Sequence, residues 1–254
     1  MIHSERVKSL RSGIFKGKSV LYWMIREKRS SDNWSLISAQ KVALKNKVPL
    51  YVCFQYLGNF PESNSRQYKF LFKGLLQLQE ALNKKNITFI FLKGKASEVI
   101  PKLIYDKCIG TVIVDYSPLK IYKNRIQSVL GKINIPFFQV DAHNIVPIWR
   151  SSGKKEFAAH TIRKKINAKL NKYLTDYPVV QKHPFGQCEK NDISLNQLIK
   201  ELNIDSSVDE VQWIDSGENA GNDKIKKLKT TLINFNKYRN DPTKNSLSNL
   251  SPYI

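Results

Sequence analysis

The residues that could contact a ligand follow short apolar runs of the chain. Asp115 comes directly after residues 111–114, and Asp141 and His143 come after residues 136–140. If these runs are parallel strands of an α/β sheet, their carboxyl ends form the edge where such sheets bind ligands. An Asp at this position either contacts a ligand or caps the following turn. For His143 the sequence favours a structural role, because a lone histidine is commonly satisfied by local hydrogen bonds.

Three basic residues follow the first apolar run, residues 19–25. Arg26, Lys28 and Arg29 could contact a phosphate or another acidic group of a ligand. They could equally form a basic loop that is simply solvated, and the sequence does not separate the two interpretations.

Several common catalytic and cofactor motifs are missing from the sequence. It contains no phosphate-binding P-loop, and no Gly-x-Gly-x-x-Gly follows the first apolar run. There is no His-Glu-x-x-His or Cys-x-x-Cys, and the four histidines are far apart, so we expect no metal site. Cys53, Cys108 and Cys188 are too few and too scattered for a disulfide framework, which suits a reducing compartment.

The elements that must position these residues alternate between strands and helices. The helical segments include residues 33–47, for which Asp32 is the expected N-cap, and an apolar stripe from Tyr68 to Leu82 spaced three and four apart. Continuous apolar runs separated by helices favour a parallel sheet covered on both faces. We therefore predict an α/β fold, a doubly wound, Rossmann-like parallel sheet, with five strands at residues 19–25, 50–56, 87–92, 111–114 and 136–140.

The pattern changes after Trp149. Residues 154–174 favour one helix with a basic outer face, and residues 177–205 favour an extended connector that contains several prolines. A small polar loop is expected at residues 215–223, followed by a helix over residues 223–238.

Length, composition and charge bound the function classes. The 254 residues suffice for one large domain, or for one domain and part of another, and 41% hydrophobic content provides for a core. No apolar run is long enough to span a membrane, and residues 1–18 are a basic arm without the apolar stretch of a secretory signal. A charge of +21 is as well explained by nucleic-acid binding as by a compositional bias toward Lys, Asn and Ile.

Specific strings extend this interpretation, and they occur in one order along the chain. The sequence is similar to class II DNA photolyases of the photolyase/cryptochrome family. The strings that carry the resemblance are YWMIREKR at 22–29 with DNW at 32–34, VDYSPLK at 114–120, QVDAHNIVPIW at 139–149, KEFAAHTIR at 155–163, RNDPT at 239–243 and LSNLSPY at 247–253.

This resemblance implies a DNA-repair enzyme. Such enzymes bind DNA that contains a cyclobutane pyrimidine dimer, take the dimer out of the stack and split it by electron transfer from light-excited reduced FAD. The positive charge then has a role in holding the phosphate backbone. The resemblance also implies a monomer, a nuclear or cytoplasmic location and an optional antenna chromophore of unknown identity.

The family pattern also divides the chain. Residues 1–18 are expected to form a flexible arm, residues 19–150 the α/β antenna domain and residues 151–222 a helical and extended linker. Residues 223–254 then begin the all-α FAD-binding domain, which is incomplete here.

A few positions carry over to the flavin site. The family places the segment that matches Leu247, Ser248, Asn249 and Leu250 against FAD, and hydroxyl, amide and backbone N–H groups suit a diphosphate. Without the resemblance these residues are an ordinary helix cap. Phe235 stands where the family usually has Tyr, which keeps a ring but removes a hydroxyl.

The resemblance covers an N-terminal portion of the family, so no catalytic residue is assigned. We expect a fragment or truncated gene product that is inactive alone and binds FAD weakly or not at all. Its four tryptophans, Trp23, Trp34, Trp149 and Trp213, are expected to be packing residues. The alternatives are a stand-alone α/β module that binds a nucleotide or pigment, and a cryptochrome-like photosensor.

Overall fold

The computed structural model describes residues 4–58, 63–190, 193–202, 204–244 and 246–253. These residues belong to two compact units. One unit comprises residues 1–58 and 81–192, and the other comprises residues 59–80 and 193–254. The long helix α2 (Ser65–Lys84) contributes residues to both.

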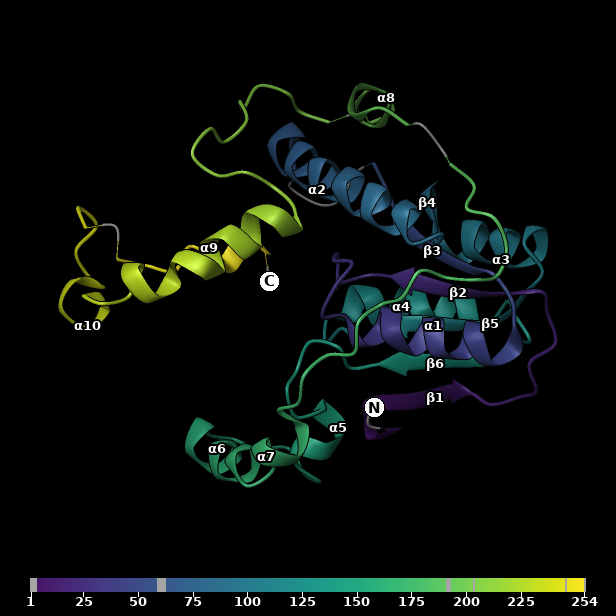
Figure 1. The fold of residues 1–254 in the computed structure, drawn as a ribbon, viewed down its shortest axis with the longest axis horizontal. Helices are drawn as coiled ribbons and strands as arrows, with labels where there is room; N and C mark the ends of the chain where they lie inside the picture. The colour runs from purple at the N-terminus through teal and green to yellow at the C-terminus, as the bar shows by residue number, and fades with distance from the viewer. Residues whose placement is uncertain (1–3, 59–62, 191–192, 203, 245, 254) are drawn as a thin grey trace. The chain divides into compact units, whose positions relative to one another are not determined.

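The first unit is built on a twisted, mostly parallel sheet with helices packed against it (Figure 1). The strand order is β1-β6-β5-β2-β3-β4, and all neighbours are parallel except β1 and β6. The five strands predicted from the apolar runs are confirmed, with small differences at their ends. The strands are β1 (Val7–Arg11), β2 (Ser19–Met24), β3 (Leu50–Tyr56), β4 (Thr88–Lys93), β5 (Ile109–Asp115) and β6 (Phe137–Val140).

Strand β1 corrects the expectation of a flexible arm at residues 1–18. Val7 lies opposite Val140 in the antiparallel ladder, so the arm adds an edge strand to the sheet. The sequence of this strand, VKSLR, is short and mostly polar, as is common for an edge strand that faces water. A short 3-10 turn, η1 (Ser4–Arg6), precedes it.

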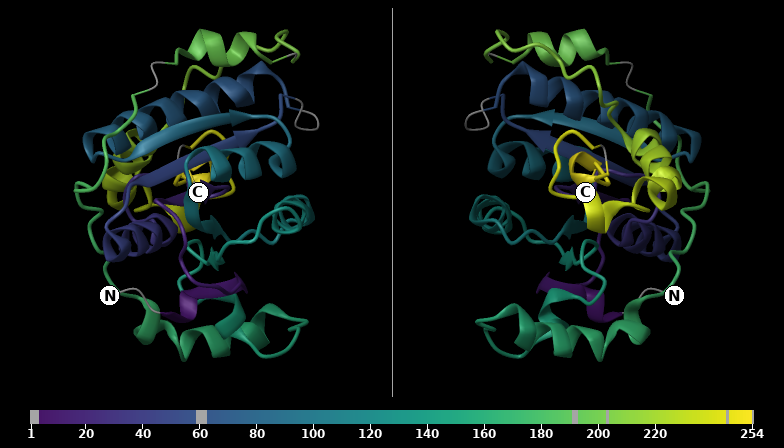
Figure 2. Two further views of the ribbon diagram at one scale, coloured as in Figure 1. Left: turned by 90° about the vertical axis from the view of Figure 1, so that its right-hand side faces the viewer. Right: turned by 90° about the vertical axis from the view of Figure 1, so that its left-hand side faces the viewer.

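Helices cover both faces of the sheet. Helix α1 (Trp34–Asn46) packs on one face, and α3 (Ala96–Asp106) and α4 (Lys120–Leu130) pack on the other (Figure 2). Because side chains alternate along a strand, Leu21 and Trp23 of β2 point toward α3 and α4. These residues are buried in a cluster with Ile100, Val129, Phe137 and other apolar side chains.

Helix α1 begins one residue later than the sequence suggests. Asn33, not Asp32, is the N-cap, and its side chain accepts a hydrogen bond from the backbone N–H of Leu36 at 3.0 Å. Asp32 has φ of 47°, a left-handed conformation that Asp and Asn tolerate better than most residues. The chain turns at Asp32, and the next residue, Asn33, caps the N-terminus of α1.

The single helix expected over residues 154–174 is interrupted. The structure contains α6 (Ala159–Asn167) and α7 (Leu170–Tyr173) instead, and a further short helix, α5 (Ile148–Ser151), lies before this range. The N–H of Lys169 bonds to the carbonyl of Ile166 at 2.9 Å, a tightened turn of the kind that ends helices. Residues 154–158 are not helical.

The second unit is mostly helical. Its elements include α8 (Leu195–Lys200), α9 (Glu218–Thr231), α10 (Phe235–Tyr238) and the 3-10 turn η2 (Ser251–Tyr253). Helix α9 begins inside the loop expected at residues 215–223, and the helix expected over 223–238 is divided between α9 and α10. Inside this unit Phe70 of α2 packs against Tyr253, with ring centroids 6.3 Å apart.

The tryptophans differ in burial. Trp23 and Trp34 are core residues, and the indole N–H of Trp149 donates to the carbonyl of Glu5. Trp213 is 70% exposed, which corrects the expectation that all four are packing residues. Among the helices that the structure describes, none is long and apolar enough to span a membrane.

Candidate functional site

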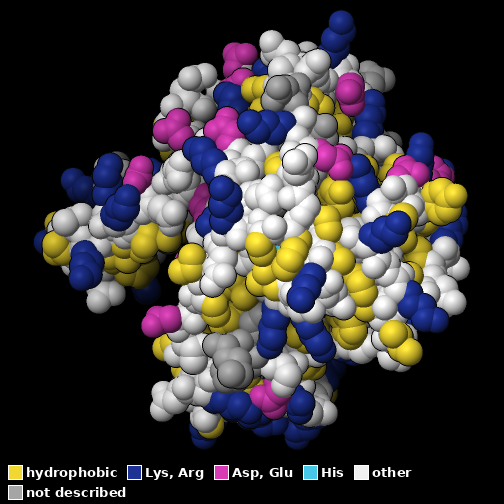
Figure 3. Space-filling view, turned by 45° about the vertical axis from the view of Figure 1, so that its right-hand side comes forward, with side chains coloured by type: hydrophobic (Ala, Val, Ile, Leu, Met, Phe, Trp, Pro, Cys, Tyr) yellow, Lys and Arg dark blue, Asp and Glu magenta, His cyan; other side chains and the backbone are white. Residues whose placement is uncertain are grey.

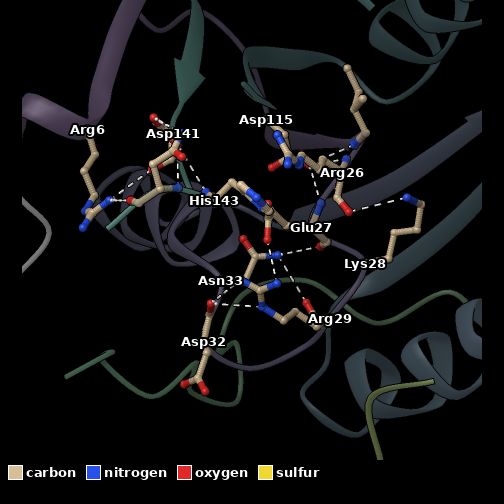
Figure 4. A network of polar contacts seen from close by, with 12 residues as sticks. Arg6, Arg26, Glu27, Lys28, Arg29, Asp32, Asn33, Asp115, Asp141 and His143 are labelled. Atoms are coloured by element: carbon tan, nitrogen blue, oxygen red, sulfur yellow. Dashed lines mark hydrogen bonds and ion pairs between the residues drawn. The ribbon is translucent and has the colours of Figure 1, made fainter. Parts of the chain in front are cut away.

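The sheet has its topological switch point between β2 and β5. From β2 the chain continues to β3 and β4 on one side, and it later returns to β5 and β6 on the other. The chain therefore leaves β2 and β5 in opposite directions, and α/β sheets bind ligands at the carboxyl ends of the strands beside such a switch point. Residues 25–33, Asp115, Asp141 and His143 meet at this edge (Figure 4).

Asp115 organises the loop after β2. One carboxylate oxygen accepts the hydroxyl of Tyr22 at 2.8 Å. The other accepts the backbone N–H groups of Ile25, Arg26 and Glu27 at 2.9, 2.9 and 3.1 Å. With both oxygens engaged and no exposed surface, Asp115 has the structural role that was one of its two interpretations.

Asn33 fixes the far end of the same loop. Its side-chain amide donates to the Tyr22 hydroxyl at 3.2 Å and to the carbonyls of Glu27 and Arg29 at 2.9 and 3.2 Å. Burial and the neighbouring Asp115 carboxylate raise the pKa of Tyr22, so this phenol stays protonated. Side chains from β2, from β5 and from the N-cap of α1 thus fix the loop that follows β2.

Glu27 is the buried acid of the site, with 2% of its surface exposed. Its carboxylate pairs with Arg29 Nη1 at 2.7 Å and with His143 Nδ1 at 3.3 Å. Burial raises the pKa of Glu27, whereas Arg29, and to a smaller extent His143, act against this rise. His143 therefore has a specific protein partner, as its structural interpretation requires.

The three basic residues of the loop have different surroundings. Arg29 pairs with Glu27 and also donates to the carbonyl of Asp32. Lys28 lies 5.7 Å from the ring centre of Phe54, and burial lowers its pKa. Only the guanidinium of Arg26, which is half-buried, forms no hydrogen bond or ion pair with the residues that the structure describes. Arg26 is thus the candidate contact for an acidic ligand.

Asp141 has a role like that of Asp115. Its carboxylate accepts the backbone N–H groups of Asn144 and Ile148 at 3.0 and 2.7 Å and caps the turn after β6. Arg6, the last residue of η1, is 1% exposed and contacts the same turn. Its guanidinium donates to the carbonyls of Asn144, Ile145, Asp141 and Tyr173.

The candidate flavin residues lie in the second unit. Phe235 is the first residue of α10 and is half-buried. Leu247, Ser248, Asn249 and Leu250 form a non-helical segment directly before η2, and Asn249 has φ of 50°. In the described part of the chain this segment leads into one 3-10 turn rather than a long helix.

Sequence reasoning missed Glu27, Asn33 and Arg6. An acid inside the string REKR predicts surface exposure, because charged residues are mostly exposed. Asn33 could have been found from the string DNW, since Asn is as good an N-cap as Asp. The described residues contain no group of three or more His, Cys, Asp or Glu that could hold a metal ion.

The strand order and the covering helices define an α/β domain of the doubly wound class. Residues 20–184 match the sequence model of the DNA photolyase family, and the chain belongs to that family. The chain is 37% identical over 243 residues to the deoxyribodipyrimidine photo-lyase of Potorous tridactylus, covering 94% of this chain and 46% of the relative. It is 35% identical over 247 residues to the enzyme of that name from Arabidopsis thaliana, covering 92% and 50%.

Solved structures share the fold. A class III photolyase from Agrobacterium tumefaciens aligns with a TM-score of 0.65 at 19% identity, over 97% of this chain and 52% of that one. A cryptochrome from Synechocystis sp. PCC6803 aligns with a TM-score of 0.66 at 15% identity, over 92% and 52%. The chain thus spans about half the length of the curated relatives and solved structures it matches.

Proposed function

We propose that this chain is the N-terminal part of a class II photolyase that splits cyclobutane pyrimidine dimers in DNA with light. One observation carries the proposal: relatives named deoxyribodipyrimidine photo-lyase match nearly the whole chain at up to 37% identity. The class assignment rests on the strings at residues 22–34 and 139–149. Half the length of these relatives has no counterpart here, so the 254 residues alone are proposed to be inactive.

FAD is the cofactor that this function requires, and residues 246–250 have suitable chemistry for it. The Ser246 hydroxyl is buried, and within the described residues it has no hydrogen-bond partner. Ser248 and Asn249 add a hydroxyl and an amide next to it, a donor set that suits the diphosphate of a dinucleotide. We assign Ser248 and Asn249 to the diphosphate, and Leu247, Leu250 and Phe235 to apolar parts of the cofactor. When bound, the reduced flavin supplies the electron for repair.

The absorption spectrum of the purified protein tests the cofactor assignment. The 254-residue chain should lack flavin bands, whereas the product of a longer reading frame that contains it should carry them. In that longer protein S248A/N249A should lower flavin occupancy at least several-fold, and the matched change S128A/N124A on α4 should leave it unchanged. Stoichiometric FAD on the 254 residues would contradict the assignment of an incomplete pocket.

A second candidate function is binding of a nucleotide or an antenna pigment by the α/β domain. Arg26 at the switch point favours it, because its guanidinium is half-buried, pairs with none of the described residues and suits a phosphate or carboxylate. If it is correct, the fluorescence of a bound nucleotide analogue should report binding to the 254-residue chain. R26Q should then weaken binding about tenfold, whereas K120Q should not. Binding without any light-dependent repair by the longer protein would favour the stand-alone module.

The proposed partner is DNA, and the protein is proposed to act as a monomer in the nucleus or cytoplasm. The cryptochrome-like photosensor remains the competing role on the same fold. The two roles differ in the loss of dimers from DNA, because a photosensor binds flavin and responds to light without removing dimers.

A further inference from the structure

Residues 154–172 form a strongly basic surface that does not include the loop after β2. This segment holds seven Lys or Arg residues and one acidic residue, Glu156, whereas the whole chain has 42 against 21. The ratio rises from two to one in the chain to seven to one here, so a general bias in composition does not explain it. The basic residues of this α6 surface are Lys154, Lys155, Arg163, Lys164, Lys165, Lys169 and Lys172.

Three of these cations are already engaged within the first unit. Lys165 pairs with Glu156, and Lys172 pairs with Glu5. Lys169 donates to the backbone carbonyl of Arg150 at 2.5 Å.

The other four cations, Lys154, Lys155, Arg163 and Lys164, are exposed. In the part of the chain that the structure describes, none of them pairs with a carboxylate. Uncompensated cations gathered on one surface attract a polyanion.

The α6 surface is held to the edge of the sheet. The Tyr173 hydroxyl donates to the Glu5 carboxylate at 2.7 Å, and Arg6 donates to the Tyr173 carbonyl at 3.4 Å. The indole N–H of Trp149 also donates to the carbonyl of Glu5. Figure 3 shows Lys and Arg side chains gathered at the lower end of the molecule, where α5, α6 and α7 lie in Figure 1.

The outer face of α6 suits nucleic acid better than a lipid surface. A helix that inserts into a membrane needs a continuous apolar face opposite its charges. Here Ile162 and Ile166 are half-buried, whereas Arg163, Lys164 and Asn167 are exposed. Phe157 is the one large apolar side chain of residues 154–172 that is mostly exposed, at 92%.

A phosphate backbone fits this arrangement of charges. Nine helical residues span about 13 Å, or about four base-pair steps of duplex DNA. Lys155 lies 5.8 Å from the ring centre of Phe157 in the loop before the helix, so the loop adds a cation beside an exposed ring.

We propose that the α6 surface binds the phosphate backbone of duplex DNA without regard to sequence or damage. The proposal deepens the proposed function, since it gives the DNA partner a contact surface on the first unit, and it rests on that function for the identity of the polyanion. Phosphate contacts position a protein on the duplex and carry no base information. Binding here should therefore need neither flavin nor a dimer.

The test is the salt dependence of binding to an undamaged fluorescent duplex, measured by anisotropy with the 254-residue chain. The triple variant K155Q/R163Q/K164Q removes three exposed cations of the α6 surface. The control K102Q/K120Q/K123Q removes three exposed cations of α3 and α4 and has the same net charge. Circular dichroism checks that both variants keep their secondary structure.

We expect the α6 variant to bind at least about tenfold more weakly than the parent chain at moderate salt. Its slope of log K against log salt should be smaller in magnitude by about 2 to 3, because each lost phosphate contact removes about 0.9. The control variant should change the slope by less than half as much.

Equal losses in the two variants would overturn the proposal, because the charge would then act as a diffuse field. Binding to vesicles of anionic lipid that is lost in the α6 variant, with DNA binding retained, would overturn it in favour of a membrane surface. Light-driven repair is measured separately. DNA binding lost in the α6 variant, in a protein without photorepair, would uphold this surface while refuting the proposed function.

Discussion

The Tyr22 hydroxyl donates a hydrogen bond to the Asp115 carboxylate at 2.8 Å, and this contact joins β2 to the end of β5 at the switch point of the sheet. The same carboxylate binds three backbone N–H groups of the loop that carries Arg26 and Glu27. The loop at the switch point is therefore held by a fully buried acid whose two oxygens are both engaged within the protein.

Replacement of Asp115 should cost more stability than replacement of its partner. D115A leaves three buried N–H groups without an acceptor, and we expect a loss of about 3 to 5 kcal/mol in the free energy of unfolding. Y22F removes two hydrogen bonds, the one to Asp115 and the one from Asn33, and should cost about 1 to 2 kcal/mol. Denaturant unfolding measures both, and a D115A loss no larger than that of Y22F would show that the loop does not depend on the carboxylate.

Arg6 should not be replaceable by lysine. Its planar guanidinium donates to four carbonyls from the turn after β6 and from α7, a geometry that an ammonium group does not reproduce. We expect R6K to lower the free energy of unfolding by about 2 to 4 kcal/mol. R11K is the matched control at the end of the adjacent strand β1, where Arg11 is half-buried and makes fewer bonds. Equal effects of the two changes would refute this role of Arg6.

His183 should make stability depend on pH. It is 1% exposed and its Nε2 lies 2.8 Å from the Val48 carbonyl oxygen, and burial lowers its pKa below the usual 6.5. As the pH falls below about 6.5 the unfolded chain binds a proton that the folded chain resists, so stability falls until the lower folded pKa is reached.

The variant H183Q should remove this contribution, which is about 1.4 kcal/mol for each pH unit by which the folded pKa lies below the unfolded one. The free energy of unfolding, measured between pH 7.5 and 5, should therefore fall less in H183Q than in the parent chain. H160Q, which replaces an exposed histidine, serves as the control. If H183Q and H160Q show the same pH dependence, His183 is not the titrating group.

The strands could be predicted because burial on both faces leaves continuous apolar runs such as residues 109–115 and 50–56. Strand β1 could not, since an edge strand needs neither length nor hydrophobicity and VKSLR has little of either. The interruption between α6 and α7 was also missed, because the apolar spacing continues through it while the hydrogen bonds change.

The candidate site was predicted only in its position. Asp115, Asp141 and His143 lie at the expected edge, but the sequence does not reveal that Glu27 is buried between Arg29 and His143. That pairing depends on the loop geometry set by Asn33 and Asp115, which are distant in sequence. The flavin residues depend on the family resemblance alone.

The most direct test of the proposed function counts the cyclobutane dimers that remain in ultraviolet-irradiated DNA. The protein is the product of the reading frame that contains these 254 residues, loaded with reduced FAD, and matched samples are kept in light and in darkness. Dimers should disappear only in the light, and the 254-residue chain alone should remove none. Undiminished dimers in the light, with flavin and DNA both bound, would contradict the proposed function.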